Sequence, residues 1–284
     1  MKRISLLAAF VALTFVPQAS ATNTWIKSLA EAEKKAKTGN QLIFVDLFAD
    51  WCGWCHKMEQ EVFPSQAFQT ATDKMVLLRL NTEDGKDGTE IARQFAASSL
   101  PTFLILTGDR ELAGIIRGYQ PPSVFVRMLD DQQKQYQEFY ERTKTDSSLT
   151  APDKRLEAAK EIISRFGYAR SEARFEALIN QRGVPASVRD EAYYQLALAQ
   201  WIQHKYDDSM TTLDKFAKVQ KSGEFYERSR LLKSDNYIGK GNWNAAADNL
   251  RTFKKTYPQS RFVPTVDNIL PQIEQQIKLT AGKK

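Results

Sequence analysis

The chain has 284 residues, of which 42% are hydrophobic and 26% charged, so it is long enough to form two domains with buried cores. Its 40 Lys and Arg residues outnumber its 34 Asp and Glu residues only slightly, and the two kinds of charge are interleaved. Without a polybasic run, this pattern excludes nucleic acid as an expected partner.

The first residues are typical of an export signal. Lys2 and Arg3 precede the apolar run Ile4–Val16, and residues 19–21 (Ala-Ser-Ala) have the small-x-small pattern of a signal peptidase site. The apolar run is shorter than the ~20 residues that a spanning helix needs. We therefore predict a cleaved signal peptide at residues 1–21, no membrane span in the mature chain, and a periplasmic location.

Residues 22–142 alternate between helical and strand-like patterns, which predicts an α/β sandwich. Short apolar runs rich in β-branched residues predict buried strands, and apolar residues at helical spacing predict helices. The predicted strands are 41–48, 75–80, 102–106 and 112–116, with a turn at Gly108-Asp109; the predicted helices are 25–37, 58–72, 89–97 and one from Ser123 onward.

The pattern changes after this first part of the chain. Residues 143–152 are polar and aperiodic, which predicts a linker. Strand-like runs are missing from residues 153–284, where helical patterns dominate. We therefore predict a second, all-α domain that begins at residue 153.

This helical region contains a weak internal repeat. Tyr206–Phe216 aligns with Trp243–Phe253, with an aromatic residue, a leucine and a phenylalanine at the same spacing, and a fainter copy includes Tyr168, Phe175 and Leu178. A period of this size with paired helices is typical of helix-turn-helix solenoids, and the segments resemble tetratricopeptide repeats. An unrelated helical bundle is the alternative.

The two cysteines of the chain stand together in the run Trp51-Cys52-Gly53-Trp54-Cys55. A strand that leads into this run and then a helix places Cys52 near a helix N-terminus, where free N–H groups favour a thiolate. Cys55 lies one turn further in and can attack a mixed disulfide at Cys52. The spacing predicts an exposed nucleophile and a sheltered resolving thiol. A structural disulfide is the alternative, although so short a loop contributes little stability.

The run Leu42–Cys55 resembles the active-site strand and turn of thioredoxins. Downstream, Leu100-Pro101-Thr102-Phe103 resembles their cis-proline loop, and Gly118 resembles the glycine that opens their last helix. The resemblance covers about residues 25–142. It implies a thioredoxin-like fold and thiol–disulfide exchange with protein substrates.

The resemblance also implies how a substrate is bound. Pro101, joined to Leu100 by a cis peptide bond, is expected beside the cysteine pair. The backbone of Leu100 is then expected to offer strand-like hydrogen bonds to an extended substrate peptide. Trp51 and Trp54 are expected to contact the partner, although Trp51 could instead cap the core.

Further residues are expected to adjust the chemistry. Asp46 matches the buried acid of thioredoxins, which exchanges a proton with the resolving thiol of Cys55; the alternative is a solvent-facing acid. Arg79 stands where the family often has lysine and could moderate the acid, or it could simply be exposed. His56 could favour the thiolate of Cys52 as a cation, or could be a solvated bystander.

Two other kinds of site compete for the same residues. Cys52-x-x-Cys55-His56 is also the haem-attachment pattern, but the α/β setting and the downstream Leu-Pro-Thr disfavour it. A structural zinc site needs four ligands, and only His56 and His204 could complete the set. His204 is expected to be an ordinary surface residue. We therefore expect neither a metal nor a cofactor.

Gly53-Trp54 replaces the Gly-Pro that thioredoxins commonly have between their cysteines. In this the chain is similar to exported thioredoxin-like proteins, some of which resemble the terminal domain of membrane disulfide reductases. The similarity favours reduction or isomerisation over disulfide formation and implies a membrane redox partner. The competing hypothesis is a non-enzymatic periplasmic adaptor that binds proteins through its helical repeats.

Overall fold

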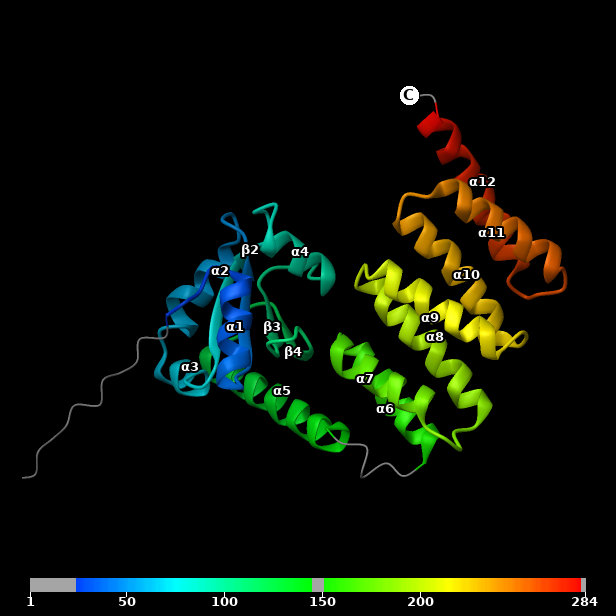
Figure 1. The fold of residues 1–284 in the computed structure, drawn as a ribbon. Helices are drawn as coiled ribbons and strands as arrows, with labels where there is room; N and C mark the ends of the chain where they lie inside the picture. The colour runs from blue at the N-terminus through cyan, green and yellow to red at the C-terminus, as the bar shows by residue number, and fades with distance from the viewer. Residues whose placement is uncertain (1–23, 145–150, 282–284) are drawn as a thin grey trace, which may run out of the picture.

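The computed structural model describes residues 24–144 and 151–281, which form two parts (Figure 1). The first is a four-stranded sheet with helices packed on it, and residues 151–281 form helices only. The predicted fold class, an α/β sandwich followed by an all-α region, is confirmed. The predicted signal peptide and most of the predicted linker lie outside the described residues.

The sheet has the strand order β2-β1-β3-β4. β1 (Ile43–Phe48) runs parallel to β2 (Val76–Asn81) and antiparallel to β3 (Thr102–Leu106), and β3 pairs antiparallel with β4 (Leu112–Arg117). The strands lie close to their predicted ranges. Because β1 is an inner strand, its C-terminal end carries the chain from the middle of the sheet directly into the cysteine run.

Helices cover both faces of this sheet. They are α1 (Leu29–Gly39), α2 (Gly53–Lys57), the π-helical turn η1 (Met58–Val62), α3 (Gln66–Ala71), α4 (Asp87–Gln94) and α5 (Pro122–Thr143). Side chains alternate along a strand, so Val45 and Leu47 pack in one core with residues of α1 and α4. Phe44 packs on the opposite face, with residues of η1, α3 and α5.

The predicted helix 25–37 begins later than expected. Ile26 instead forms a parallel bridge with Leu78 of β2, so the preceding residues extend along the sheet. The helix starts after Ser28, whose hydroxyl accepts a hydrogen bond from the backbone N–H of Glu31 at 3.4 Å. Serine is a preferred N-cap, and this signal inside the apolar pattern marks the true start.

The predicted continuous helix 58–72 is wrong. The chain forms η1 and leaves the helix before Pro64, which has no N–H to continue it. Ser65 then caps α3 by accepting the backbone N–H of Phe68 at 3.3 Å. The π-helical turn is wider than an α-helical one, and such turns are frequent at functional sites.

The second part is a series of packed helices: α6 (Pro152–Ser164), α7 (Tyr168–Asn180), α8 (Ala186–Ile202), α9 (Tyr206–Val219), α10 (Glu224–Gly239), α11 (Trp243–Thr256) and α12 (Val263–Ala281). Each helix contacts the next, and α8 also contacts α6 and α10 (Figure 1). The two clearest sequence copies begin α9 and α11, and the leucine and phenylalanine of each copy are buried. The region is consistent with a helical-repeat domain.

The turn between α6 and α7 packs on the first part of the chain. Ile162 is fully buried and belongs to the same core as Phe139 of α5. The carbonyl of Arg165 accepts the backbone N–H of Leu112 at 2.7 Å, and the Phe166 ring lies 4.6 Å from that of Phe95. These contacts join the two parts through both backbone and apolar side chains.

A buried ion pair strengthens the same junction. The guanidinium of Arg170 on α7 donates to both carboxylate oxygens of Glu111, at 2.6 and 3.1 Å, and to the hydroxyl of Thr143 at 3.1 Å. Glu111 is only 4% exposed, and burial raises the pKa of its carboxyl despite the nearby arginine. Removing one partner of a buried pair leaves the other charge uncompensated, so the pair resists separation of the two parts.

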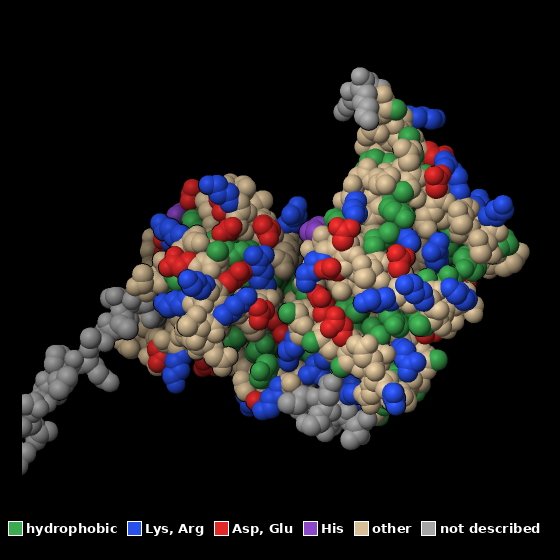
Figure 2. Space-filling view, viewed as in Figure 1, with side chains coloured by type: hydrophobic (Ala, Val, Ile, Leu, Met, Phe, Trp, Pro, Cys, Tyr) green, Lys and Arg blue, Asp and Glu red, His purple; other side chains and the backbone are tan. Residues whose placement is uncertain are grey.

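A cavity of about 860 Å³ remains between the two parts, lined by α4, the β3–β4 turn and the connections α6–α7 and α8–α9. Figure 2 shows the molecule hollowed between its two parts, with Lys and Arg side chains intermixed with Asp and Glu over the visible face.

Candidate active site

The two cysteines form a disulfide at the start of α2, with an S–S distance of 2.06 Å. Cys52 is the N-cap of α2, and its sulfur accepts the backbone N–H of Cys55 at 3.1 Å. A hydrogen bond to a sulfur favours its charged form, so the same N–H group stabilises a thiolate at Cys52 once the disulfide is reduced. The local structure is therefore suited to a dithiol in which Cys52 is the nucleophile.

The exposure of the two sulfurs differs from the prediction. Cys52 is only 3% exposed and Cys55 1% exposed, so neither is an open nucleophile in the disulfide form. The prediction of a sheltered Cys55 is confirmed, and that of an exposed Cys52 is wrong for the oxidised protein.

Asp46 lies in the middle of β1 and is 1% exposed, which confirms the prediction that it is buried. Strand register places it beside Arg79 of β2, whose Nε lies 3.1 Å from Oδ2. This contact is an ion pair too bent for a hydrogen bond, and neither carboxylate oxygen has a hydrogen-bond partner within the described residues. Burial outweighs the attraction of Arg79 and raises the pKa of Asp46 to about 7.

Arg79 is partly buried and joins Asp46 to a second acid that sequence reasoning missed. Its Nη2 contacts the carboxylate of Glu59 on η1, and its guanidinium lies 4.1 Å from the centre of the Phe48 ring. Glu59 stands four residues after Cys55, one helical turn further on. That spacing was a usable signal, but only the fold brings β2 to the same place.

The Leu100–Pro101 peptide bond is cis, as the resemblance implies. Thr102, the next residue, lies opposite Leu47 in the sheet, so the proline loop stands at the edge from which β1 enters the cysteine run. The carbonyl of Pro101 accepts the backbone N–H of Gly118 at 2.8 Å, which fixes the residue that follows, Tyr119, at this edge.

Aromatic side chains surround the cysteine pair. Trp51 is 69% exposed and Trp54 57% exposed, and both offer large apolar surfaces to solvent. Trp54 stacks on Tyr119 with 5.3 Å between ring centres, and the amine of Lys57 lies 4.9 Å from the centre of the Tyr119 ring. Sequence reasoning missed Tyr119, because no local pattern connects it to the motif. Only the pairing of Pro101 with Gly118 does.

The two histidines lie in different parts of the molecule. His56 is exposed on α2, where its Nε2 lies 2.9 Å from the carbonyl of Asp50 and its Nδ1 3.6 Å from Glu59. His204 is exposed at the α8–α9 connection and contacts the hydroxyl of Tyr206 at 2.6 Å. The structure thus keeps His56 near the cysteine pair, while His204 lies among the helices of the second part.

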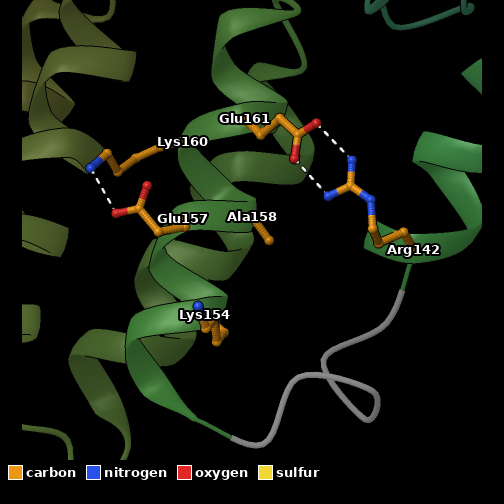
Figure 3. A pocket seen from close by; sticks show the side chains of 6 residues that line it. All are labelled: Arg142, Lys154, Glu157, Ala158, Lys160 and Glu161. Carbon is orange, nitrogen blue, oxygen red and sulfur yellow. Dashed lines mark hydrogen bonds and ion pairs between the residues drawn. The ribbon is translucent and has the colours of Figure 1, made fainter.

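The cavity drawn in Figure 3 lies between α5 and α6 and contains none of these residues. Four of its five charged side chains pair with one another, Arg142 with both carboxylate oxygens of Glu161 and Lys160 with Glu157, and Lys154 is the fifth. No charged group there points to chemistry at the cavity.

Fold and site together define an α/β protein with a disulfide-forming cysteine pair, a buried acid and a cis-proline at one edge of the sheet. Comparison gives the family: residues 29–133 match the model of the thioredoxin-like domain. The thioredoxin of Alicyclobacillus acidocaldarius is 30% identical over 98 residues, which cover 34% of this chain and 88% of that protein. The chain belongs to the thioredoxin-like family.

The chain is also similar to two other proteins. The thiol:disulfide interchange protein DsbD of Actinobacillus pleuropneumoniae is 30% identical over 110 residues, which cover 37% of this chain. The chain spans about a fifth (19%) of the length of that relative. The solved structure of a DsbH oxidoreductase aligns with a TM-score of 0.38 at 17% identity, over 45% of this chain and 95% of that one.

Proposed function

We propose that this chain is an exported thiol–disulfide oxidoreductase that exchanges disulfides with protein partners through Cys52 and Cys55. One observation carries the proposal: the disulfide at the N-cap of α2 lies at the same end of the sheet as the cis-proline loop. Asp46, a buried acid, lies in β1, the strand that leads to this disulfide.

In the reductive direction the cycle starts from the reduced dithiol. The Cys52 thiolate attacks a substrate disulfide, which forms a mixed disulfide and releases one substrate thiolate. Cys55 then attacks the sulfur of Cys52 and releases the second substrate thiolate. The substrate gains two electrons, and the protein is left with the Cys52–Cys55 disulfide.

Asp46 is the proposed proton acceptor in the second step. Cys55 must lose its thiol proton to attack, and a carboxyl with a pKa of about 7 can accept and return that proton near neutral pH. The proton then passes to the departing substrate thiolate or to solvent. Arg79 is proposed to moderate this acid, and His56 to favour the thiolate of Cys52.

The substrate is proposed to lie across the edge formed by the cis-proline loop. Leu100 would offer its backbone to an extended peptide, as in β-strand addition. Trp51 and Trp54 would contact apolar side chains that flank the substrate disulfide, because large rigid aromatic surfaces are favoured at protein interfaces. Tyr119 supports Trp54 by stacking against it.

Trp54→Ala is expected to lower the rate of reduction of a protein disulfide by about tenfold or more, in line with the loss of an aromatic contact at an interface. The rate with a small disulfide such as that of Ellman's reagent should change little, since such a molecule needs no flanking surface. Steady-state kinetics with both substrates checks this. Equal losses on both would mean that Trp54 acts on the cysteines themselves.

The proposed cell compartment and direction rest on two observations. Residues 1–21 have the expected pattern of a signal peptide, and Gly53-Trp54 between the cysteines resembles exported thioredoxin-like proteins that are similar to membrane disulfide reductases. We propose a periplasmic protein that favours reduction or isomerisation and is recharged by a membrane redox partner. Within residues 24–144 and 151–281, no helix combines the length and hydrophobicity that a membrane crossing requires.

The proposal is tested by adding the purified chain to a disulfide-containing protein with dithiothreitol as electron source. We expect faster reduction than with dithiothreitol alone; an unchanged rate would contradict the proposal. Equilibration with glutathione tests the direction. A reduction potential close to about −270 mV indicates a reductant, and one close to about −120 mV an oxidant.

A second candidate function is that of a non-enzymatic adaptor. The repeated burial pattern of α9 and α11, and the contacts of α8 with both α6 and α10, favour tetratricopeptide-like repeats, and such arrays commonly bind proteins. We propose that the helical region recruits or orients the partner of the thioredoxin-like domain. If it acts alone, partner binding survives the loss of Cys52.

A further inference from the structure

Arg79, which pairs with the buried acid of the proposed reaction, also pairs with a second carboxylate. Arg79 lies between two carboxylates: that of Asp46, which is buried on β1, and that of Glu59, which is partly exposed on η1. The guanidinium donates a hydrogen bond from Nη2 to Glu59, whereas its Nε meets Asp46 as an ion pair at 3.1 Å. The arginine is therefore directed towards the surface acid.

The π-helical turn accounts for this placement. Glu59 and Glu61 both lie on η1, but they have different partners. Glu59 contacts Arg79, whereas Glu61 accepts a hydrogen bond from the hydroxyl of Tyr119 and lies 3.7 Å from the amine of Lys57. The two acids thus provide a matched pair: same turn, same charge, and only one of them connected to Asp46 through Arg79.

We propose that Glu59 is a positioning residue that holds the Arg79 guanidinium away from full pairing with Asp46, so that the Asp46 carboxyl remains available to take up and release a proton. This inference rests on the proposed function, because the proton in question is the one that Cys55 loses during exchange. Among the described residues, the charged partners of Glu59 are Arg79 and His56, and Glu59 acts on Asp46 through the arginine.

Electrostatics support the geometry. Burial and two charged groups set the protonation of Asp46: burial raises its pKa most, Arg79 lowers it, and the negative charge of Glu59 raises it again. These charges reach Asp46 from β2 and η1, and its cross-strand neighbour on β3, Phe103, is uncharged. Glu59 itself faces Arg79 and, at 3.6 Å, Nδ1 of His56.

A simple surface ion pair between Glu59 and Arg79 is the competing explanation. In that case Glu59 would act on Asp46 only through its own negative charge, and the shift caused by Glu59→Gln would persist in full when Arg79 is also replaced by glutamine. The two explanations therefore differ in a quantity that can be measured on the oxidised protein, without substrate and without turnover.

The test is the titration of the Asp46 carboxyl by carbon NMR in the disulfide form of wild type, Glu59→Gln and Glu61→Gln. With the charge of Glu59 removed, Arg79 can pair fully with Asp46, so the midpoint should move to lower pH by about one unit. Glu61→Gln should leave the midpoint unchanged. Glu59→Asp, which keeps the charge on a shorter side chain, should give a midpoint between those of wild type and Glu59→Gln.

An unshifted midpoint in Glu59→Gln, an equal shift in Glu61→Gln, or a shift of the same size when Glu59→Gln is made on an Arg79→Gln background would overturn the inference. If Glu59→Gln does not fold, the comparison of wild type with Glu59→Asp still decides, because a shorter side chain must weaken the contact with Arg79. The pH profile of the resolving step should follow the carboxyl midpoint. If the titration shifts as expected but no variant or wild type exchanges disulfides, the proposed function fails and the coupling of the two acids does not.

Discussion

Replacing Cys52 by serine is expected to reduce disulfide exchange to the rate of dithiothreitol alone. A hydroxyl cannot take the place of the thiolate in a mixed disulfide, so the first step of the cycle is lost. The fold should persist, because the Cys52–Cys55 loop is short and its closure contributes little stability. The measurement is the reduction rate of a protein disulfide with equal amounts of wild type and variant.

Cys55→Ser provides the matched comparison. It keeps the nucleophile and removes the resolving thiol, so a mixed disulfide between Cys52 and the substrate should accumulate and appear in mass spectra as a covalent adduct. Exchange by Cys52→Ser at the wild-type rate would show that Cys52 is not the nucleophile. Partner binding that is unaffected by both changes would favour the adaptor hypothesis.

Asp46→Asn is expected to stabilise the oxidised protein at alkaline pH. The carboxyl has a pKa of about 7 in the folded chain, against an ordinary value of 3.8. Between these two values the folded state binds more protons than the unfolded state, so the free energy of unfolding falls as the pH rises through this window. A shift of this size corresponds to as much as about 4 kcal/mol above pH 7.

The neutral amide removes this loss. The free energy of unfolding of Asp46→Asn should therefore exceed that of wild type by up to about 4 kcal/mol at pH 8. The difference should be small close to pH 4, where the carboxyl is protonated in the folded state and close to its titration midpoint in the unfolded state. Urea unfolding at the two pH values measures it. Arg79 keeps Glu59 as a partner in the variant, so no buried charge is left alone.

Asp50→Asn serves as the control for removing one negative charge, since Asp50 is an exposed residue four positions along the chain. A loss of stability at pH 8 in Asp46→Asn, or a gain of equal size at pH 4 and pH 8, would contradict the assignment of a destabilising buried charge. The same variant should slow the resolving step, because Cys55 loses its proposed proton acceptor.

Local patterns were sufficient for much of the fold. The strand that contains Asp46 was predictable because a short apolar run bounded by polar residues has few alternatives, and the acid within it had to be buried with its neighbours. The cysteine pair and the Leu100–Pro101 cis bond were predictable because each belongs to a motif only a few residues long. Such features depend on neighbours in sequence.

What could not be predicted depends on residues far apart in the chain. Arg79 and Glu59 meet only because β2 lies beside β1 and the π-helical turn follows α2. Tyr119 reaches Trp54 only through the pairing of Pro101 with Gly118. The break before Pro64 is different: proline was visible in the sequence, but the apolar pattern on both sides outweighed it in the prediction.

The packing of the α6–α7 turn on the first part of the chain limits which bound partners could present a disulfide to the cysteine pair. Because Arg170 pairs with Glu111 and Ile162 is buried in the shared core, these contacts restrict movement of the helical region relative to the thioredoxin-like domain. A protein bound to the later helices would then be held at one fixed distance from the cysteine pair. Only disulfides at that distance from the bound segment would gain effective concentration. The fixed contact between the two parts would therefore select substrates by the position of their disulfides.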